Sequence, residues 1–501
     1  MSTLSPLLPA LIPVLPLLAG LLCRGRAPET AGRIALLAAS LSALSAAGFA
    51  VLHGVAEISS GALLKFDGVS SVMVVLVSFL GAVVLRFSRN YLAGDPHQAR
   101  FFSWMSLTLA AVITLVLSGH LLLLLGAWVA TSLCLHRLLL HHPERAGAIF
   151  SARKKFVFSR LGDVCLAAAI VILFWSHGTL ELDGLFASIA AGNSGGLPAA
   201  GYLIVSCAAL KSAQFPFHSW LPDTMETPTP VSAFMHAGII NAGGFLIVRL
   251  SPLFTHAPGA LNALAILGTL TAAFGAVVML AQPGVKRALA YSTIAQMGFM
   301  MVQCGLGAYG LALLHIVAHS LYKANAFLTS GSSVGAVPRA AVRLCLPALA
   351  LGLPAGGLLA VGGATIMHAL LPSAPHAPVV FVMILALALA YGIARAVSAD
   401  RGAGTILSAL VFAAGIALAG LGLHAGAETL FARLPGVTPP LPLLVFVGAV
   451  FAGLFVFQSL MWRIGGRPAG RGIYVHALNG FYFGTFANRL LSRLWPRHSS
   501  N

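Results

Sequence analysis

Charged residues are scarce in this sequence. Asp, Glu, Lys and Arg make up 8% of the 501 residues, whereas hydrophobic residues make up 58%. A soluble globular protein carries roughly a quarter of charged residues, because its surface faces water. The scarcity excludes a water-facing surface over the whole chain and leaves no room for a soluble catalytic domain. It predicts a polytopic membrane protein.

Acidic residues and cysteines are also few. The 12 acidic residues face 29 Lys and Arg, a net charge of +17. In a soluble chain this balance would suggest nucleic acid, but in a membrane protein the basic residues orient the spans, so we expect no nucleic-acid partner. The six cysteines stand singly in apolar runs, without Cys-x-x-Cys or Cys/His spacing. We expect inert thiols and neither disulfides nor a metal site.

Long apolar runs are what the sequence does contain. One helix needs about 20 apolar residues to cross a bilayer, and the runs predict an all-α fold with about 15 transmembrane helices. The first run contains several prolines and has no basic residue before it, so it is not typical of a cleavable signal peptide. The expected spans are residues 4–23, 34–52, 69–85, 101–118, 120–136, 156–176, 198–220, 229–248, 258–281, 287–304, 308–330, 344–370, 377–394, 404–423 and 440–462.

The basic residues gather in alternate loops. One set of loops holds most of them, including Lys154 and Lys155, whereas the opposite set holds only Lys65, Arg249 and Arg433. Lys and Arg accumulate in cytoplasmic loops. The pattern predicts a multi-pass protein of the bacterial inner membrane, with its N-terminus outside and its C-terminus in the cytoplasm.

The sequence after the last span differs in composition. Aromatic and leucine residues between Tyr474 and Trp495 are mixed with Arg489 and Arg493, which is typical of an amphipathic segment at the membrane surface. We therefore expect a transmembrane domain at 1–462 and a cytoplasmic amphipathic tail at 463–501. The tail either anchors the chain to membrane lipid or docks a soluble partner.

One lysine lies inside an interrupted span. Ionisable residues at membrane depth are costly unless paired or hydrated, so each is a candidate functional residue. Lys211 lies in the span 198–220, which Pro216 interrupts within KSAQFPFHSWLP. Proline removes a backbone donor and frees carbonyl oxygens for water or cations. The pattern predicts a broken helix with an ion site; the alternative is a structural lysine that extends to the membrane surface.

A second polar group lies in LLHIVAHSLYKANAF. His315, His319 and Lys323 are four residues apart, which places them on one helical face over about 12 Å. Imidazoles exchange protons near neutral pH, and a desolvated lysine can do the same. The stripe predicts a proton relay. Structural hydrogen bonding and metal binding by the two histidines are the alternatives, although no third ligand lies nearby.

Three further residues complete the expected ion pathway. His236 in PTPVSAFMHAG is a buried titratable group. Lys286 opens the span through AYSTIAQMGFM, where it either orients the protein or begins a half-channel. Asp163 in SRLGDVC is the one carboxylate clearly inside a span before Lys211. We expect Asp163 to pair with a buried cation, or alternatively with Arg160 at a helix end.

The runs that carry these residues resemble a known superfamily. The resemblance rests on LKSAQFPFHSWLPDTMETPTPVSAFMHAG, VKRALAYSTIAQMGFM and HIVAHSLYKANAFLTSGS. These are similar to the antiporter-like, proton-translocating membrane subunits shared by respiratory complex I and Mrp cation antiporters. Within it, SRNYLAGDP, WVATSLCLHRLLLHH and MHAGIINAGGFLIVR resemble most closely the DabB family, membrane subunits of the DAB inorganic-carbon accumulating complex. The resemblance covers residues 66–335 and, more weakly, YVHALNGFY. It implies an antiporter-like fold with broken helices and inverted repeats.

Two departures separate the sequence from the complex I subunits. Those subunits carry a glutamate after a tryptophan in the fifth span, where it pairs with the lysine of the seventh; here Val129 follows Trp128. Their twelfth span carries a second lysine in a broken helix. Here LGLPAGGLLAVGG keeps Pro354 for a helix break but has no charge. Both departures argue against an ordinary complex I subunit.

The resemblance also implies a function. It implies a subunit without a catalytic site of its own, which conducts H⁺ or Na⁺ down its gradient. It implies a DabA-like cytoplasmic partner whose zinc site, similar to that of β-carbonic anhydrases, hydrates CO₂ to bicarbonate. We expect contacts with that partner at Asp223 and Glu226 and along the tail from Tyr474 to Trp495. The alternatives are a subunit of a complex I-like oxidoreductase and a stand-alone Mrp-type cation/proton antiporter.

Overall fold

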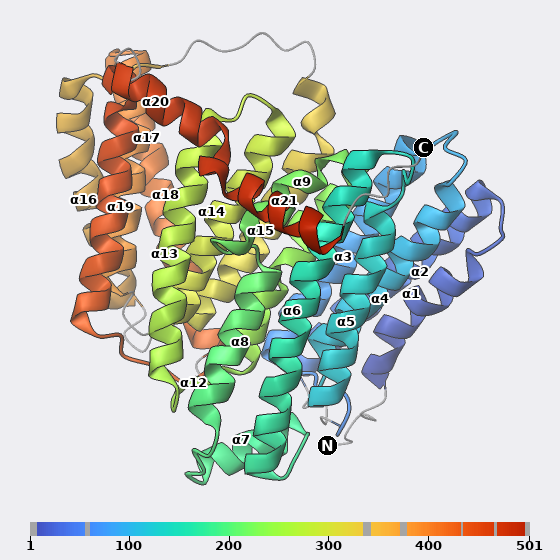
Figure 1. Cartoon of the computed structure of the whole chain (residues 1–501). Coiled ribbons are helices and arrows are strands. Elements are labelled where there is room, and N and C mark those ends of the chain that lie inside the picture. The colour runs from blue at the N-terminus through green and yellow to red at the C-terminus, as the bar shows by residue number, and fades with distance from the viewer. Residues whose placement is uncertain are drawn as a thin grey trace.

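The computed structural model describes residues 8–55, 61–333, 342–370, 378–431, 434–464 and 468–495. In these ranges the regular elements are helices, and extended pairing is limited to two isolated bridges. Twelve helical segments of the described residues are long and apolar enough to cross a membrane, and two shorter apolar helices accompany them. The long helices lie side by side in one bundle (Figure 1). The expected all-α, polytopic fold is confirmed.

The first half of the bundle contains the helices that precede the lysine-bearing break. They are α1 (Leu11–Leu22), α2 (Pro28–Val55), α3 (Gly68–Tyr91), α4 (Gln98–Leu117), α5 (Leu121–Leu139), α6 (Ala146–His177), the short α7 (Leu182–Ala190) and α8 (Leu197–Lys211).

The second half follows the first interruption of the helical backbone and contains a second one. Its elements are α9 (Trp220–Asp223), α10 (Thr229–Ala237), α11 (Ala242–Arg249), α12 (Ser251–Phe254), α13 (Pro258–Ala281), α14 (Val285–Gly305), α15 (Tyr309–Leu328), α16 (Leu346–Leu370), α17 (Val379–Ala399), α18 (Ala403–Leu430), α19 (Leu441–Ile464), α20 (Pro468–Leu478) and α21 (Phe483–Leu494).

The first interruption lies where the sequence places it. Helix α8 ends at Lys211, and the chain resumes in a 3-10 turn, Phe217–Ser219, directly after Pro216. Ala213 has a φ of 49°, in the left-handed region that residues with a Cβ rarely adopt. The buried lysine therefore stands at the open end of a helix, next to carbonyl groups that have no partner within it.

A second interruption was not expected. The span 229–248 is divided at Gly238, so that α10 and α11 are separated by a 3-10 turn, Ile239–Asn241. Gly243 packs against the first interruption, because a Cβ there would lie 2.3 Å from the Ser212 hydroxyl and 2.7 Å from the Ala208 carbonyl. The absence of a side chain at this position lets the two interrupted segments touch.

The break expected at Pro354 is wrong. Helix α16 runs without interruption from Leu346 to Leu370 with Pro354 inside it. A proline in a helix removes one backbone hydrogen bond, and neighbouring helices can support that turn in a membrane protein. Here Gly352 and Gly356 bring the α16 backbone against α17, since a Cβ on either would lie within 2.6 Å of an α17 backbone atom.

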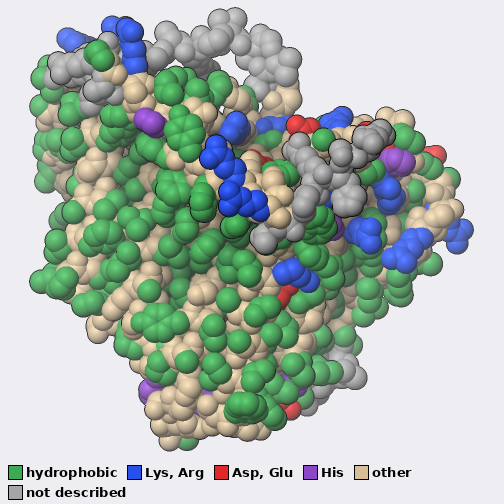
Figure 2. Space-filling view, viewed as in Figure 1, with side chains coloured by type: hydrophobic (Ala, Val, Ile, Leu, Met, Phe, Trp, Pro, Cys, Tyr) green, Lys and Arg blue, Asp and Glu red, His purple; other side chains and the backbone are tan. Residues whose placement is uncertain are grey.

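The tail helices α20 and α21 lie across the bundle rather than along it (Figure 1). Gln282 at the end of α13 donates a hydrogen bond to the Leu478 carbonyl at the end of α20, 3.1 Å away. Figure 2 shows Lys and Arg side chains over the upper part of this face, around the tail, and none among the described residues of its lowest third. The tail therefore lies at the basic end of the bundle. Residues 465–467 and 496–501 of the expected tail, together with Arg433, lie outside the described residues.

Candidate ion pathway

Lys211 is buried at the end of α8. Its side chain reaches α5, where Nζ lies 3.4 Å from the Trp128 carbonyl oxygen and 4.5 Å from the centroid of the Trp128 ring. A carbonyl dipole and an aromatic face both stabilise an ammonium group. Only 7% of the residue is exposed, so Lys211 does not extend to the membrane surface.

The cluster around Lys211 contains a second buried lysine. Helix α6 begins at Ala146, ten residues before the expected span, and carries Lys155 into the protein. Lys155 Nζ donates hydrogen bonds to the Ser132 carbonyl at 2.7 Å and to the Ser132 hydroxyl at 2.9 Å. The expectation that Lys154 and Lys155 lie in a loop is wrong, because charged residues mark the end of an apolar run but not the end of a helix.

Asp163 lies on the same helix but has another partner. Its Oδ2 is 2.6 Å from Nη2 of Arg160, the partner that the alternative named, although both residues lie inside α6 and not at a helix end. Helices α6 and α8 pack against each other, so this carboxylate lies in the layer that contains Lys211 and Lys155. Asp163 thus places a carboxylate in this layer, although it pairs with Arg160. The sequence has Val129 at the position where the complex I subunits that it resembles carry a glutamate.

Lys154 joins the first interruption to the tail. Its Nζ donates to the Ser219 carbonyl at 3.2 Å, to Asp223 at 2.8 Å and to the side-chain oxygen of Asn488 in α21 at 2.7 Å. The aromatic ring of Phe483, at the start of α21, lies 4.7 Å from that of Phe215 in the interruption. The tail is therefore seated on the break that follows Lys211.

The residues expected to meet a partner differ in their exposure. Asp223 is held by Lys154, whereas the Glu226 side chain is 52% exposed and lies 3.9 Å from Arg145. Tyr474 and Trp495 are exposed, and the guanidinium of Arg153 lies 4.9 Å from the centroid of the Trp495 ring. Glu226 and the two aromatic residues are free to contact another molecule, but Asp223 has an internal role.

The second cluster follows the face of α15. Lys323 is fully buried, and its Nζ donates to the Ser292 hydroxyl at 2.7 Å. His315 Nδ1 lies 2.8 Å from the side-chain oxygen of Gln303, and its ring centroid is 6.0 Å from that of His319. The three residues spaced by four do lie along one helix face, opposite the polar side chains of α14.

His236 connects this stripe to α10. Its Nδ1 lies 3.1 Å from the Thr293 hydroxyl on α14, and its ring stacks on Phe327 at 4.4 Å. Within the part of the chain that the structure describes, neither ring nitrogen of buried His319 has a hydrogen-bond partner, and Nε2 of His236 has none either. A buried polar atom without a partner costs about 1 to 3 kcal/mol, so these nitrogens require a water molecule or a transferred ion.

Lys286 takes a different position. It lies in the first turn of α14, at the basic end of the bundle, and is partly exposed. One turn further along α14, the Leu289 carbonyl accepts a hydrogen bond from Lys323 Nζ at 3.4 Å. The position suits either an orienting charge or the entrance to a path along α14.

Three polar residues that the sequence analysis missed connect the two clusters. The Ser212 hydroxyl donates to the Ile240 carbonyl at 2.6 Å, which joins the two interruptions. Next to Ile240, Asn241 donates its amide to the Ser320 hydroxyl on α15 at 2.9 Å. The signal for this bridge is an asparagine between glycines in an apolar span, IINAGG. Buried polar groups therefore connect the residue that follows Lys211, through the second interruption, to Ser320 on α15.

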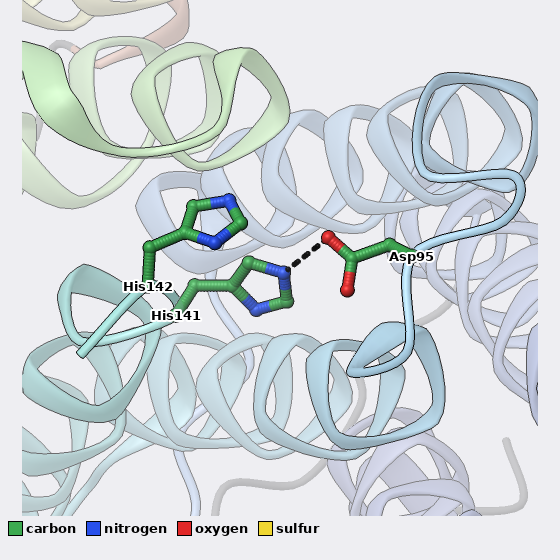
Figure 3. Close-up of side chains that lie close together, drawn as sticks. All are labelled: Asp95, His141 and His142. Carbon is green, nitrogen blue, oxygen red and sulfur yellow. Dashed lines mark hydrogen bonds and ion pairs between the residues drawn. The ribbon is translucent and has the colours of Figure 1, made fainter. Parts of the chain in front are cut away.

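A further polar cluster lies at the loops after α3 and α5. Asp95, His141 and His142 offer ligand atoms within 4.8 Å of one another (Figure 3). His141 Nε2 lies 3.1 Å from Asp95 Oδ2, and His142 lies 3.3 Å from Glu144. Burial lowers the pKa of His141 despite the nearby carboxylate. Burial raises the pKa of Asp95, but its hydrogen bonds to His97 and His141 outweigh that effect and lower it. These contacts hold the loop after α3 against the loop after α5, and this structural role explains the cluster.

Comparisons with known proteins agree with this architecture. Residues 118–344, which hold every residue of the pathway above, match the family described as NADH:quinone oxidoreductase/Mrp antiporter, TM. Residues 53–102 match the N-terminus of chain 5 of NADH-ubiquinone oxidoreductase, complex I.

Three similar proteins illustrate the range of the superfamily. A protein of Halothiobacillus neapolitanus described as "probable inorganic carbon transporter subunit DabB2" is 40% identical over 86% of this chain and 80% of its own length. Subunit L of NADH-quinone oxidoreductase from Mycobacterium tuberculosis is 40% identical over 55% of this chain and 44% of its own length. In the Mrp complex from Dietzia sp., one chain superposes with a TM-score of 0.64 at 22% identity, over 92% of this chain and 56% of that one. The last likeness shows the fold.

Proposed function

Because this chain belongs to the DabB family of antiporter-like membrane proteins, we propose that it conducts H⁺ or Na⁺ to energise inorganic carbon accumulation. The observation that carries the proposal is the buried polar route from Lys211 to Lys323. Its middle members, Ser212, Asn241 and Ser320, join two interrupted helices to the relay helix by hydrogen bonds. A membrane interior keeps such groups where an ion must pass.

Two buried lysines on facing helices suit the stepwise transfer of protons. Lys155 and Lys211 each hold one proton when charged, and two like charges in a medium of low dielectric repel each other strongly. A proton that arrives at one lysine therefore favours its release from the other. The Ser132 and Trp128 groups that hold them are carbonyls, a hydroxyl and a ring. None of these groups carries a negative charge, and the Asp163 carboxylate in the same layer is paired with Arg160, so the repulsion between the two lysines is kept.

The cytoplasmic partner in this proposal is a DabA-like protein with a zinc site that hydrates CO₂. Ion movement can drive the partner only if each ion state favours a different conformation of the partner. The clamp of Lys154 offers a mechanical link, because it holds Ser219 in the interruption and Asn488 in the tail at once. A shift of the interruption after Lys211 changes proton state would move α21, and with it the exposed aromatic residues of the tail.

The proposed orientation places the basic end of the bundle in the cytoplasm of a bacterial cell. Lys and Arg side chains around α20 and α21 support this (Figure 2). At the opposite end, Lys65 pairs with Asp183 and Arg249 pairs with Asp67, so both basic residues there are neutralised by acids. The exposed apolar side chains of the tail, such as Phe486 and Leu490, would enter the lipid headgroup region.

The test is growth and co-purification. The chain and a DabA-like zinc protein are produced together in a host without carbonic anhydrase, and growth at ambient CO₂ is measured. We expect growth with both proteins, none with Lys211→Ala, and normal growth with the exposed-loop control Arg343→Ala. Affinity capture of the chain in mild detergent should also retrieve a zinc-containing protein.

The rival functions make different predictions for the same strains. Growth rescue by this chain alone would contradict the two-protein proposal and favour a stand-alone Mrp-type antiporter. Retrieval of quinone-reducing subunits in place of a zinc protein would favour a complex I-like oxidoreductase.

A further inference from the structure

A cavity of about 570 Å³ lies beside the first turn of α15 and the last turn of α18. These turns lie at the end of the bundle opposite the basic end. The lining of the cavity combines buried and exposed residues. Tyr309 and His424 are more than nine-tenths buried, whereas Thr429, Gly436 and Thr438 are exposed. The cavity therefore leads from the surface to the interior of the bundle.

Among the described residues, the buried polar atoms of this cavity have no hydrogen-bond partners. The Tyr309 hydroxyl has none, and neither ring nitrogen of His424 has one. His424 Nδ1 lies 4.0 Å from Glu428, which is too far for a hydrogen bond. Leaving three such atoms buried and unpaired is costly, so the cavity suits hydrated cations rather than apolar side chains or lipid.

Glu428 ties the cavity to the relay helix. Its Oε1 accepts a hydrogen bond from the backbone N–H of Leu311, 3.2 Å away. Leu311 is four residues before His315, so the carboxylate stands at the end of the face that carries His315, His319 and Lys323. The spacing puts Leu311, whose N–H the Glu428 carboxylate accepts, about one helical turn, roughly 5 to 6 Å along the axis, from the first histidine of the stripe.

Helix packing favours this route over one through α16. Helix α15 packs against α18, which carries His424 and Glu428, whereas α16 packs mainly against α17 and α18. Helix α16 has neither a charged residue in its centre nor the helix break expected at Pro354. Gln303, which lies 2.8 Å from His315, is three residues from Leu306 in the cavity wall. Helix α14 therefore ends at the cavity and helix α15 begins there.

We propose that Glu428, His424 and Tyr309 form a cation vestibule on the outer side, through which H⁺ or Na⁺ passes directly between water and the His315–His319–Lys323 stripe. The inference rests on the proposed ion conduction and adds the site where the ion enters the relay. Glu428 binds the cation, and His424 and the Tyr309 hydroxyl orient its water.

The first test measures ion flux through the full chain, reconstituted with its co-purified partner in vesicles that contain a pH-sensitive dye. We expect Glu428→Gln to lower the initial H⁺ flux at least tenfold. The amide oxygen of the glutamine still accepts a hydrogen bond from the Leu311 N–H. A loss of flux is therefore caused by the missing charge and not by a missing hydrogen bond. Glu181→Gln, an exposed acid at the same end, should conduct like the parent.

A second variant moves the Glu428 carboxylate without removing its charge. A Cβ at Gly310 would lie 2.8 Å from Glu428 Oε1, so Gly310→Ala should displace the carboxylate and lower the flux. Gly420→Ala on α18, where a Cβ meets nothing within 4 Å, should leave it unchanged. Flux equal to that of the parent in both Glu428→Gln and Gly310→Ala would overturn the vestibule as the ion route.

A third measurement does not depend on transport. In intact cells, a membrane-impermeant maleimide should label His424→Cys but not Ala417→Cys, which is buried two turns deeper on α18. Absence of labelling at position 424 would overturn the vestibule even in a protein that conducts. If the parent chain conducts neither H⁺ nor Na⁺, ion conduction itself fails, and labelling then decides whether the vestibule exists.

Discussion

The hydroxyl of Ser212, the first residue beyond α8, donates a 2.6 Å hydrogen bond to the carbonyl of Ile240 in the second interrupted segment. This bond joins two breaks that are 28 residues apart in the chain. It places the end of α8, with Lys211, next to Asn241 and hence next to the relay helix. The proposed pathway depends on this contact because the hydrogen bonds that connect the end of α8 to α15 run through it and through Asn241.

Removal of that hydroxyl tests the connection. We expect Ser212→Ala to lower ion flux severalfold and the free energy of unfolding by about 1 to 3 kcal/mol, because the buried Ile240 carbonyl loses its partner. Flux in vesicles and thermal unfolding in detergent measure the two effects. Ser206→Ala, an exposed serine on the same helix, is the matched control. Unchanged flux in Ser212→Ala would show that the breaks touch without conducting.

The stripe on α15 predicts a graded response. Substitution of Lys323 by Gln should abolish flux, and Ser292→Ala should reduce it, because the Ser292 hydroxyl holds Lys323 Nζ at 2.7 Å. His319→Gln should also impair flux, since its unpartnered ring lies between His315 and Lys323 along the helix. The control is Arg343→Gln on the exposed loop. Equal loss in all variants, the control included, would indicate a general packing defect.

The pair of Asp67 and Arg249 predicts a pH-dependent stability. Burial raises the pKa of Asp67, but the charge and hydrogen bonds of Arg249 and Ser70 outweigh burial and lower it from 3.8 to about 2. A lowered pKa stabilises the fold fully above the unfolded value near 4, and this stability is lost as the pH falls from 4 toward 2. The shift corresponds to about 2 kcal/mol.

Asp67→Asn should therefore destabilise the protein by about 2 kcal/mol at pH 7, and the difference from the parent should shrink below pH 4. Unfolding in detergent at several pH values measures this. Asp183→Asn removes an exposed pair with Lys65 and should cost less than about 1 kcal/mol. A difference from the parent that stays constant between pH 7 and pH 3 would contradict the assignment to the carboxylate.

The clamp at Lys154 predicts that the tail can be released. Asn488→Ala removes the contact of α21 with Lys154, so we expect a C-terminal epitope to become more sensitive to protease while the bundle stays folded. Growth at ambient CO₂ should fall if the tail transmits the motion of the break. Ser492→Ala, whose hydroxyl bonds only within α21, should behave like the parent. Protease resistance equal to that control would mean that the aromatic contacts alone hold the tail.

Local pattern in the sequence determined much of this protein. The apolar runs require membrane-spanning helices, and the spacing of His315, His319 and Lys323 requires one helix face, because both depend only on helical geometry. Pro216 predicted the first break, since the missing N–H is a property of the residue itself. These features do not depend on which helices become neighbours.

Tertiary structure alone decided the remaining features. Lys155 lies inside the protein because α6 continues past the charged run and packs against α5, whose Ser132 accepts its hydrogen bonds. Pro354 leaves α16 unbroken because α17 supports it closely. The Ser212–Ile240 bond and the Glu428–Leu311 bond join segments 28 and 117 residues apart. No periodicity encodes such contacts, because they follow from how whole helices pack and which buried polar groups must then find partners.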